Sequence, residues 1–183
     1  MSPGIQLLYA SRDGQARRIA MRIAARLAER DIAITPHDLA TPFSAAEILA
    51  DSRVVAVVAA VRYGRHLPEA ERFFSSCRDA LTRVRLVFVS VNLSARKPGN
   101  DTAAANRYLR KSIDRHRLTP TVAAAVAGRL DYPLYTWLDR QIIRFIMKLT
   151  GGPTDPRTCV EFTAWTAVDA LAARIADLYG DAR

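Results

Sequence analysis

IQLLYASRDGQ, residues 5–15, runs from a mostly apolar segment into a polar loop that contains a glycine. Residues 5–10 fit a buried strand, and residues 11–15 form a loop that leads into a helix. The helix is indicated by apolar residues at the spacing of one helical face, namely Ile19, Ala20, Ile23, Ala24 and Leu27. A strand, a short loop and a helix in this order predict the first half of a parallel βαβ unit.

Four more strands are predicted further along the chain. Ile32 and Ile34 alternate as a short second strand that Pro36 ends, and the other three are apolar runs at residues 54–61, 86–91 and 121–127. Five strands alternating with helices favour an α/β fold with a doubly wound parallel sheet. The flavodoxin-like order 2-1-3-4-5 fits this number of strands better than a six-stranded Rossmann sheet does.

The helices between these strands have recognisable beginnings. Pro68 occupies a favoured first position of a helix, residues 103–113 are helix-forming, and Thr163 is the predicted N-cap of the last helix. An extra amphipathic segment at about 130–152 interrupts the simple alternation before that last helix. At 183 residues and 20.3 kDa, residues 1–183 have the size of a single domain that carries this inserted segment.

Charge restricts the partners without choosing one. The net charge of +9 and the pI near 10.2 favour nucleic acid, anionic lipid or a substrate with carboxylates. Nucleic acid is disfavoured because the chain has no recognised nucleic-acid-binding module. The basic run is better explained as a solvated helix face; it comprises Arg107, Arg110, Lys111, Arg115 and Arg117. The absence of a secretory signal or an apolar span of ~20 residues predicts a cytoplasmic protein.

Metal and hydrolase chemistry have no support in the sequence. Cys77 and Cys159 lack metal-ligand spacing and suit a reducing compartment. His37, His66 and His116 are scattered, so no metal site is expected. His66 follows the third strand, but we expect no catalytic role for it. No Ser/His/Asp or Cys/His arrangement is present.

The polar loop at 11–15 follows a strand and precedes a helix, where backbone N–H groups can bind a phosphate. Gly14 permits close backbone approach, and Ser11 and Gln15 can donate hydrogen bonds. An ordinary βα turn is the alternative. Residues 62–65 and 90–93 follow the third and fourth strands, so they should lie at the same sheet edge. There, Tyr63 offers an aromatic face to a flat ring, and Asn92 offers both a donor and an acceptor.

A family resemblance spans nearly the whole chain. It is carried by residues 11–15, by Arg62-Tyr63-Gly64, by the string NLSARKP at 92–98 and by the string IMKLTGGPTD at 146–155. These segments resemble the flavodoxin-like family of FMN- and quinone-dependent protoporphyrinogen IX dehydrogenases. The resemblance implies oxidation of protoporphyrinogen IX to protoporphyrin IX in haem biosynthesis, with electrons passed to menaquinone or ubiquinone. It also implies contact with an anionic membrane surface at the cytoplasmic face of the inner membrane.

The same resemblance implies where FMN binds, but it names no catalytic acid or base. The FMN-binding residues that it implies are Ser11, Arg12, Asp13, Gly14, Gln15, Ala16, Arg62, Tyr63, Gly64, Phe88, Ser90, Val91, Asn92, Leu93, Thr154 and Asp155. Ala10 and Ala16 stand where relatives carry hydroxyl residues, which predicts weaker retention of FMN. Two alternatives stay open: a flavodoxin-type electron carrier or quinone reductase with another substrate, and a binding protein without cofactor.

The segment at about 130–152 has its own pair of interpretations. Its apolar residues fall on one side of a helix, with Arg140, Arg144 and Lys148 flanking them; they are Leu134, Trp137, Leu138, Ile142, Phe145, Ile146 and Leu149. An aromatic, apolar face with cationic flanks is typical of contact with a membrane interface or a hydrophobic substrate. Packing on the chain's own domain, or on a second copy in a homo-oligomer, is the other interpretation.

Overall fold

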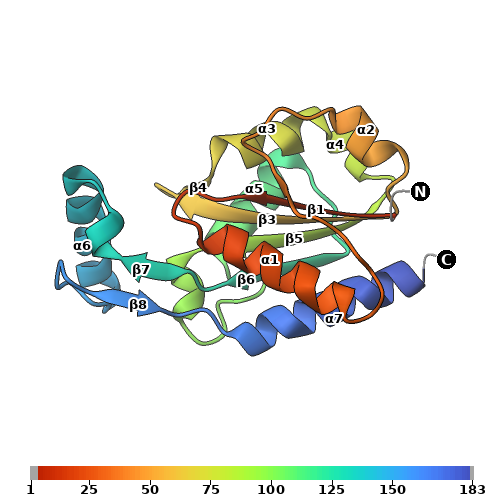
Figure 1. The fold of residues 1–183 in the computed structure, drawn as a ribbon. Coiled ribbons are helices and arrows are strands. Elements are labelled where there is room, and N and C mark those ends of the chain that lie inside the picture. Colours follow the sequence, from red (N-terminus) through yellow and green to blue (C-terminus); the bar gives the residue numbers. More distant parts are fainter. Residues whose placement is uncertain (1–3, 182–183) are drawn as a thin grey trace.

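The computed structural model describes residues 4–181, and its centre is a parallel sheet (Figure 1). Five parallel strands lie in the order β2-β1-β3-β5-β6, which confirms the predicted flavodoxin-like order. These strands are β1 (Ile5–Ala10), β2 (His37–Asp38), β3 (Val54–Arg62), β5 (Arg85–Val91) and β6 (Val122–Val126). A short strand that the sequence did not indicate, β4 (Arg65–His66), pairs antiparallel with the end of β3.

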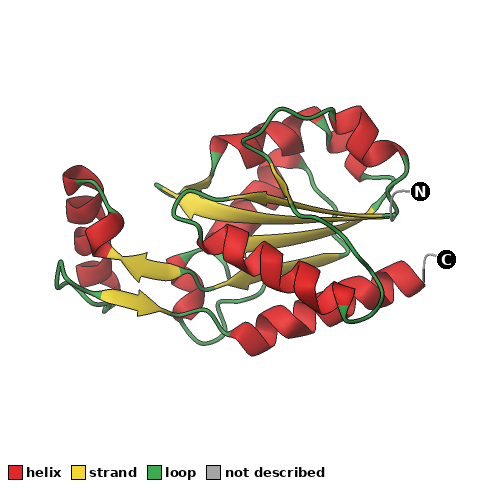
Figure 2. Ribbon diagram, viewed as in Figure 1, coloured by secondary structure: helices red, strands yellow, loops and turns green. Residues whose placement is uncertain are grey.

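Helices cover both faces of the sheet (Figure 2). One face carries α1 (Gln15–Ala28) and α7 (Trp165–Gly180), and the other carries α2 (Ala45–Ala50), α3 (Pro68–Ser76), α4 (Arg78–Leu81) and α5 (Arg107–His116). The β3 strand shows why helices must cover both faces of the sheet. Its successive side chains alternate between the two cores, so Val54 packs in one and Val55 in the other. A strand that is buried on both faces therefore consists of an unbroken apolar run.

The second strand lies further along the chain than predicted. Ile32 and Ile34 pack partly buried against the core, but they form no ladder, and the Ile32 N–H still bonds to the Leu27 carbonyl. The chain reaches the sheet edge only after Pro36, where His37 and Asp38 pair with β1. Alternating apolar residues here therefore mark a buried connection rather than a strand.

Two predicted helix beginnings are also wrong. The final helix has Ala164 as its N-cap, because the hydroxyl of Thr163 donates to the Ala127 carbonyl, 2.7 Å away. The helix predicted over 103–113 begins at Arg107 instead. The Asn106 side chain accepts from two backbone N–H groups of its first turn and so fixes that start.

An excursion of the chain between β6 and α7, residues 129–161, is called the insert below. It contains β7 (Arg129–Asp131), the 3-10 turn η2 (Tyr132–Leu134), α6 (Trp137–Thr150) and β8 (Cys159–Glu161). β7 and β8 pair antiparallel and connect α6 to the sheet edge at which the parallel strands end (Figure 1). The insert is longer than predicted, because β8 brings in residues beyond 152. No helix within residues 4–181 is long and apolar enough to cross a membrane.

Candidate functional site

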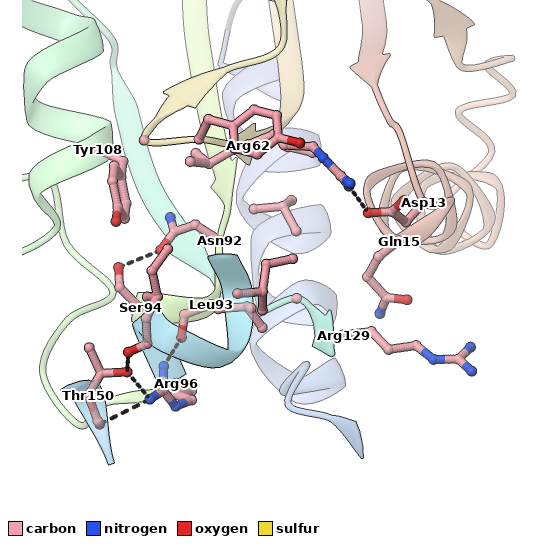
Figure 3. Close-up of a pocket in the computed structure, with 18 of the residues that line it drawn as sticks. Asp13, Gln15, Arg62, Asn92, Leu93, Ser94, Arg96, Tyr108, Arg129 and Thr150 are labelled. Carbon is pink, nitrogen blue, oxygen red and sulfur yellow. Dashed lines mark hydrogen bonds and ion pairs between the residues drawn. The ribbon is translucent and has the colours of Figure 1, made fainter. Parts of the chain in front are cut away.

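A cavity of about 760 Å³ lies at the carboxyl ends of β1, β3 and β5. Its floor is formed by loops of the parallel sheet, and α6 contributes an apolar wall that includes Ile142, Ile143 and Ile146. Figure 3 shows the polar lining, with Asp13 and Gln15 on one side and Tyr108 on the other. Three loops that are far apart in the sequence therefore meet where the sequence predicted a site.

Most of the predicted site residues line this cavity: Ser11, Asp13, Gln15, Ala16, Arg62, Tyr63, Gly64, Val91, Asn92 and Leu93. Gly14 borders a second, shallower cavity on the outer side of the same loop. Phe88 and Ser90 are fully buried beneath the floor. Arg12 is exposed and lines neither cavity, and Thr154 and Asp155 lie in the loop after α6, outside the lining.

The loop between β1 and α1 has the features of an anion site. The Ser11 hydroxyl is buried and has no hydrogen-bond partner among the described residues. Gly14, the N-cap of α1, has φ 85° and provides no side-chain cap, so the first N–H groups of the helix remain available. Unpaired buried donors beside a helix N-terminus fit a phosphate group. Ala16, 1% exposed, offers no hydroxyl at this position.

The Gln15 side chain makes three hydrogen bonds within the protein. Its amide nitrogen donates to the Thr163 hydroxyl at 2.8 Å and to the Glu161 carboxylate at 3.2 Å, while its oxygen accepts from Arg18. Burial raises the pKa of Glu161, but the hydrogen bonds from Arg18 and Gln15 outweigh this effect and leave the pKa below its ordinary value. Gln15 therefore connects the loop to the end of the insert.

The turn after β3 presents Tyr63 to the cavity. Tyr63 and Gly64 both have positive φ, 52° and 79°, which the two-residue connection to the antiparallel β4 requires. The Tyr63 ring is 64% exposed, and its hydroxyl donates to Asp139 of α6. An aromatic face is therefore held at the cavity by a contact with the insert.

Asn92 lines the cavity, but its amide group is directed into the protein. The amide nitrogen donates to the Ser90 hydroxyl at 3.0 Å, and the oxygen accepts from Ser94, from the Ala95 N–H and from Asn106. The side chain is only 4% exposed. Asn92 thus holds the loop that follows β5 in place. Other residues of this loop, including Leu93 and Ser94, line the cavity beside it.

We expect Asn92→Ala to lower the free energy of unfolding by about 2 kcal/mol, because Asn106 and the Ala95 N–H lose their buried partner. Ser94→Ala removes only one of the donors to the Asn92 oxygen and should cost less. Denaturant unfolding of both variants measures this effect. Equal stability of Asn92→Ala and the wild type would show that the network does not hold the loop.

Arg62 connects the anion-binding loop to the insert. Its guanidinium contacts Asp13 at 2.7 Å and also contacts Asp139, which in turn accepts from the Tyr63 hydroxyl. It lies over the ring of Tyr135, 5.6 Å from the centroid. Burial raises the pKa of the Tyr135 hydroxyl. The pairing of Arg62 with Asp139 was not predicted, because the two residues lie 77 positions apart.

Arg96 makes a second connection at the other end of α6. Its guanidinium donates to the Leu93 carbonyl at 2.9 Å, and to the Thr150 hydroxyl and carbonyl at 3.0 and 3.2 Å (Figure 3). Since Asp139 and Thr150 lie near opposite ends of α6, the helix is held at both ends against the sheet loops. Between these two points, Ile142, Ile143, Ile146 and Met147 line the cavity.

His66 lies beneath the floor of the cavity and does not line it. Its ring nitrogen lies 2.8 Å from the Ser90 hydroxyl, and burial lowers its pKa to about 4. The imidazole is therefore neutral at neutral pH and packs against Phe88. The Ser90 hydroxyl therefore contacts both the His66 ring and the Asn92 amide, and His66 helps to position Asn92 in this way.

Comparison with known proteins connects this geometry to a family. The model of the flavodoxin domain matches residues 6–157. The protoporphyrinogen IX dehydrogenase [quinone] of Escherichia coli K12 is 38% identical over 174 residues, 94% of each chain. The Leishmania major protein of the same name is 35% identical over 97% of this chain and 76% of its own. Flavodoxin 1 of Bacillus cereus shares the fold, with a TM-score of 0.51, 12% identity and 97% coverage of each chain. The chain therefore belongs to the flavodoxin-like family of quinone-dependent protoporphyrinogen IX dehydrogenases.

Proposed function

We propose that this chain oxidises protoporphyrinogen IX to protoporphyrin IX with FMN as its cofactor, and that the electrons pass to a quinone. The observation that carries the proposal is the cavity itself. An anion-binding loop forms one end of it, and an apolar helix that ordinary flavodoxin topology does not require forms a wall above the middle. The named relatives from E. coli and L. major support the same activity.

The residues present fit FMN. The phosphate would lie on the Ser11 hydroxyl and the N–H groups at the start of α1, and the flat ring would lie between Tyr63 and the loop that Asn92 holds. When bound, FMN supplies the hydride and electron transfer. The chain itself binds and orients the two partners, and the apolar side chains of α6 exclude water from the cavity.

An anaerobic assay with purified holoprotein tests the proposal. Protoporphyrinogen IX is supplied with and without menaquinone or ubiquinone, and protoporphyrin IX is measured by its fluorescence. We expect flavin to copurify with the protein and porphyrin to form only when a quinone is present. Quinone reduction by another donor, with no porphyrin formed, would instead indicate a flavodoxin-type carrier or a quinone reductase. A protein that cannot bind FMN would indicate a binding protein without cofactor.

The outer face of α6 supports contact with an anionic membrane at the cytoplasmic face of the inner membrane. Its exposed apolar residues include Trp137 at 72%, Phe145 at 64% and Leu149 at 70%. Lys148 lies in the last turn of the same helix, and the whole chain carries a net charge of +9. Such a face binds the interface of anionic lipid, and quinone lies in that membrane. A homo-oligomer that buries the same face is the alternative.

We expect Trp137→Ser combined with Phe145→Ser to reduce binding to anionic vesicles and quinone-coupled turnover, each by at least about tenfold. Both side chains are exposed, so FMN content and unfolding free energy should stay near the wild-type values. Met21→Ser, which removes a 50% exposed apolar residue of α1, is the control. Unchanged vesicle binding would contradict the membrane proposal, and conversion of an oligomer to a monomer would favour the alternative.

A further inference from the structure

Within residues 4–181, two positive charges on the cavity lining have no anionic partner. Lys97 follows the 3-10 turn η1 (Leu93–Arg96), and Arg107 is the first residue of α5. Both line the cavity and both are exposed. Among the described residues neither forms an ion pair, and the Arg107 guanidinium lies 5.5 Å from the centroid of the Tyr108 ring. Figure 3 shows Tyr108 on the side away from Asp13 and Gln15, with Asn92 between them.

The other arginines of the cavity already have partners within the protein. Arg62 is paired with two carboxylates, Arg96 with the Leu93 and Thr150 carbonyls, and Arg129 with Asp131 at 2.6 Å. Asp13 is the sole acidic residue among those that line the cavity in the described chain, and it is paired with Arg62. The cavity lining therefore carries an excess of positive charge, which Lys97 and Arg107 contribute.

Arg107 also differs from the other cations of its helix. Arg115 pairs with Glu71 at 2.8 Å, and Arg110 donates to the Ala104 carbonyl at 2.7 Å. Neither of them lines the cavity, and Lys111 does not line it either. Arg107 therefore differs from the solvated helix face predicted for the basic run, because it lines the cavity.

The part of the cavity wall that α6 forms is mostly apolar. Ile142, Ile143, Ile146 and Met147 of α6 all line it. A ligand that matches this lining is a large, mostly apolar molecule with carboxylates on one edge. Protoporphyrinogen IX has this chemistry, because its two propionates are borne on adjacent pyrroles and its other edge carries apolar substituents.

We propose that Lys97 and Arg107 bind the two propionate carboxylates of the tetrapyrrole, so that its apolar edge lies under α6. This inference rests on the proposed function. The two residues would select tetrapyrroles with adjacent carboxylates and would set the edge that enters the cavity first. Charge-assisted hydrogen bonds of this kind are stronger than neutral ones, and Arg can bind a carboxylate through two parallel bonds.

A binding titration tests the inference on the FMN-loaded protein, with protoporphyrin IX and its dimethyl ester as probes in the same detergent. The variants are Lys97→Gln, Arg107→Gln and the two together, and Lys111→Gln is the matched control. We expect the wild type and Lys111→Gln to bind the free acid at least about tenfold more tightly than the ester, and the double variant to lose this preference. The single variants should lie between these limits.

Turnover distinguishes this inference from the function on which it rests. We expect the double variant to have a KM for protoporphyrinogen IX raised by about tenfold or more, with unchanged flavin content and unchanged KM for the dimethyl ester. A wild type that oxidises protoporphyrinogen IX but binds acid and ester equally would overturn the inference alone. So would a double variant that keeps the preference, or that loses its flavin. A wild type that forms no porphyrin would overturn the proposed function, and the titration would still decide whether the cations bind carboxylates.

Discussion

Gly14→Val should give a folded protein that lacks flavin. Gly14 has φ 85°, a conformation that a β-branched residue rarely adopts, so the loop must change its backbone angles. That change rotates the N–H groups at the start of α1 away from the phosphate. Loss of about two hydrogen bonds to a charged group corresponds to an FMN dissociation constant raised by at least about 100-fold. Flavin absorbance after purification and FMN titration of the apoprotein measure the effect.

Gly99→Val is the matched control for this variant. Gly99 has a similar φ of 76°, and no atom of the protein lies within 4 Å of an added Cβ at either position. Both variants should therefore lose a similar amount of stability, about 1–2 kcal/mol from backbone strain. Only Gly14→Val should lose flavin. If both variants retain it fully, the phosphate lies elsewhere.

Arg62→Met should have the largest effect on stability. It leaves Asp139, whose side chain is 10% exposed, without a counterion, and it also removes the partner of Asp13. Breaking a buried ion pair by removing one partner costs about 3 kcal/mol or more. Denaturant unfolding measures the loss, and hydrogen exchange should show faster exchange in α6 than in the strands of the parallel sheet.

Combining Asp139→Leu with Arg62→Met measures the interaction between the two side chains apart from the effect of each substitution alone. Arg62 keeps Asp13 when Asp139 alone is replaced, so Asp139→Leu should cost less than Arg62→Met. The double variant should recover part of the loss, because no buried charge remains unpaired. Additive losses in the double variant would mean that the two side chains stabilise the insert independently.

Local patterns predicted the parallel sheet, and distant contacts explain what they missed. The positions of β1 and β3 that pack in the two cores are all apolar, since both faces of these strands are buried. The strand β8 has only three residues, of which Cys159 and Glu161 are exposed, so it has no apolar pattern to detect. Thr163 has the residue type of an N-cap, but its hydroxyl instead donates to the Ala127 carbonyl, directly after β6, and accepts from Gln15 of α1.

The candidate site was predicted by position better than by role. Ser11, Tyr63 and Asn92 line the cavity because carboxyl ends of parallel strands meet at one edge, which the sequence can reveal. The roles depend on partners far along the chain. Gln15 bonds to Thr163, 148 positions away, and Tyr63 bonds to Asp139, 76 positions away. No pattern within a short window contains such pairs.

The insert leaves the sheet and returns to it at one point. The Phe162 N–H bonds to the Gly128 carbonyl at 3.1 Å, so the residues on either side of the insert are neighbours in space. A chain that passed from Gly128 to Phe162 directly would therefore need almost no rearrangement of β6 or α7. The length of the insert is therefore independent of the spacing between β6 and α7, and its placement over the cavity depends on side-chain contacts such as those of Arg62 and Arg96.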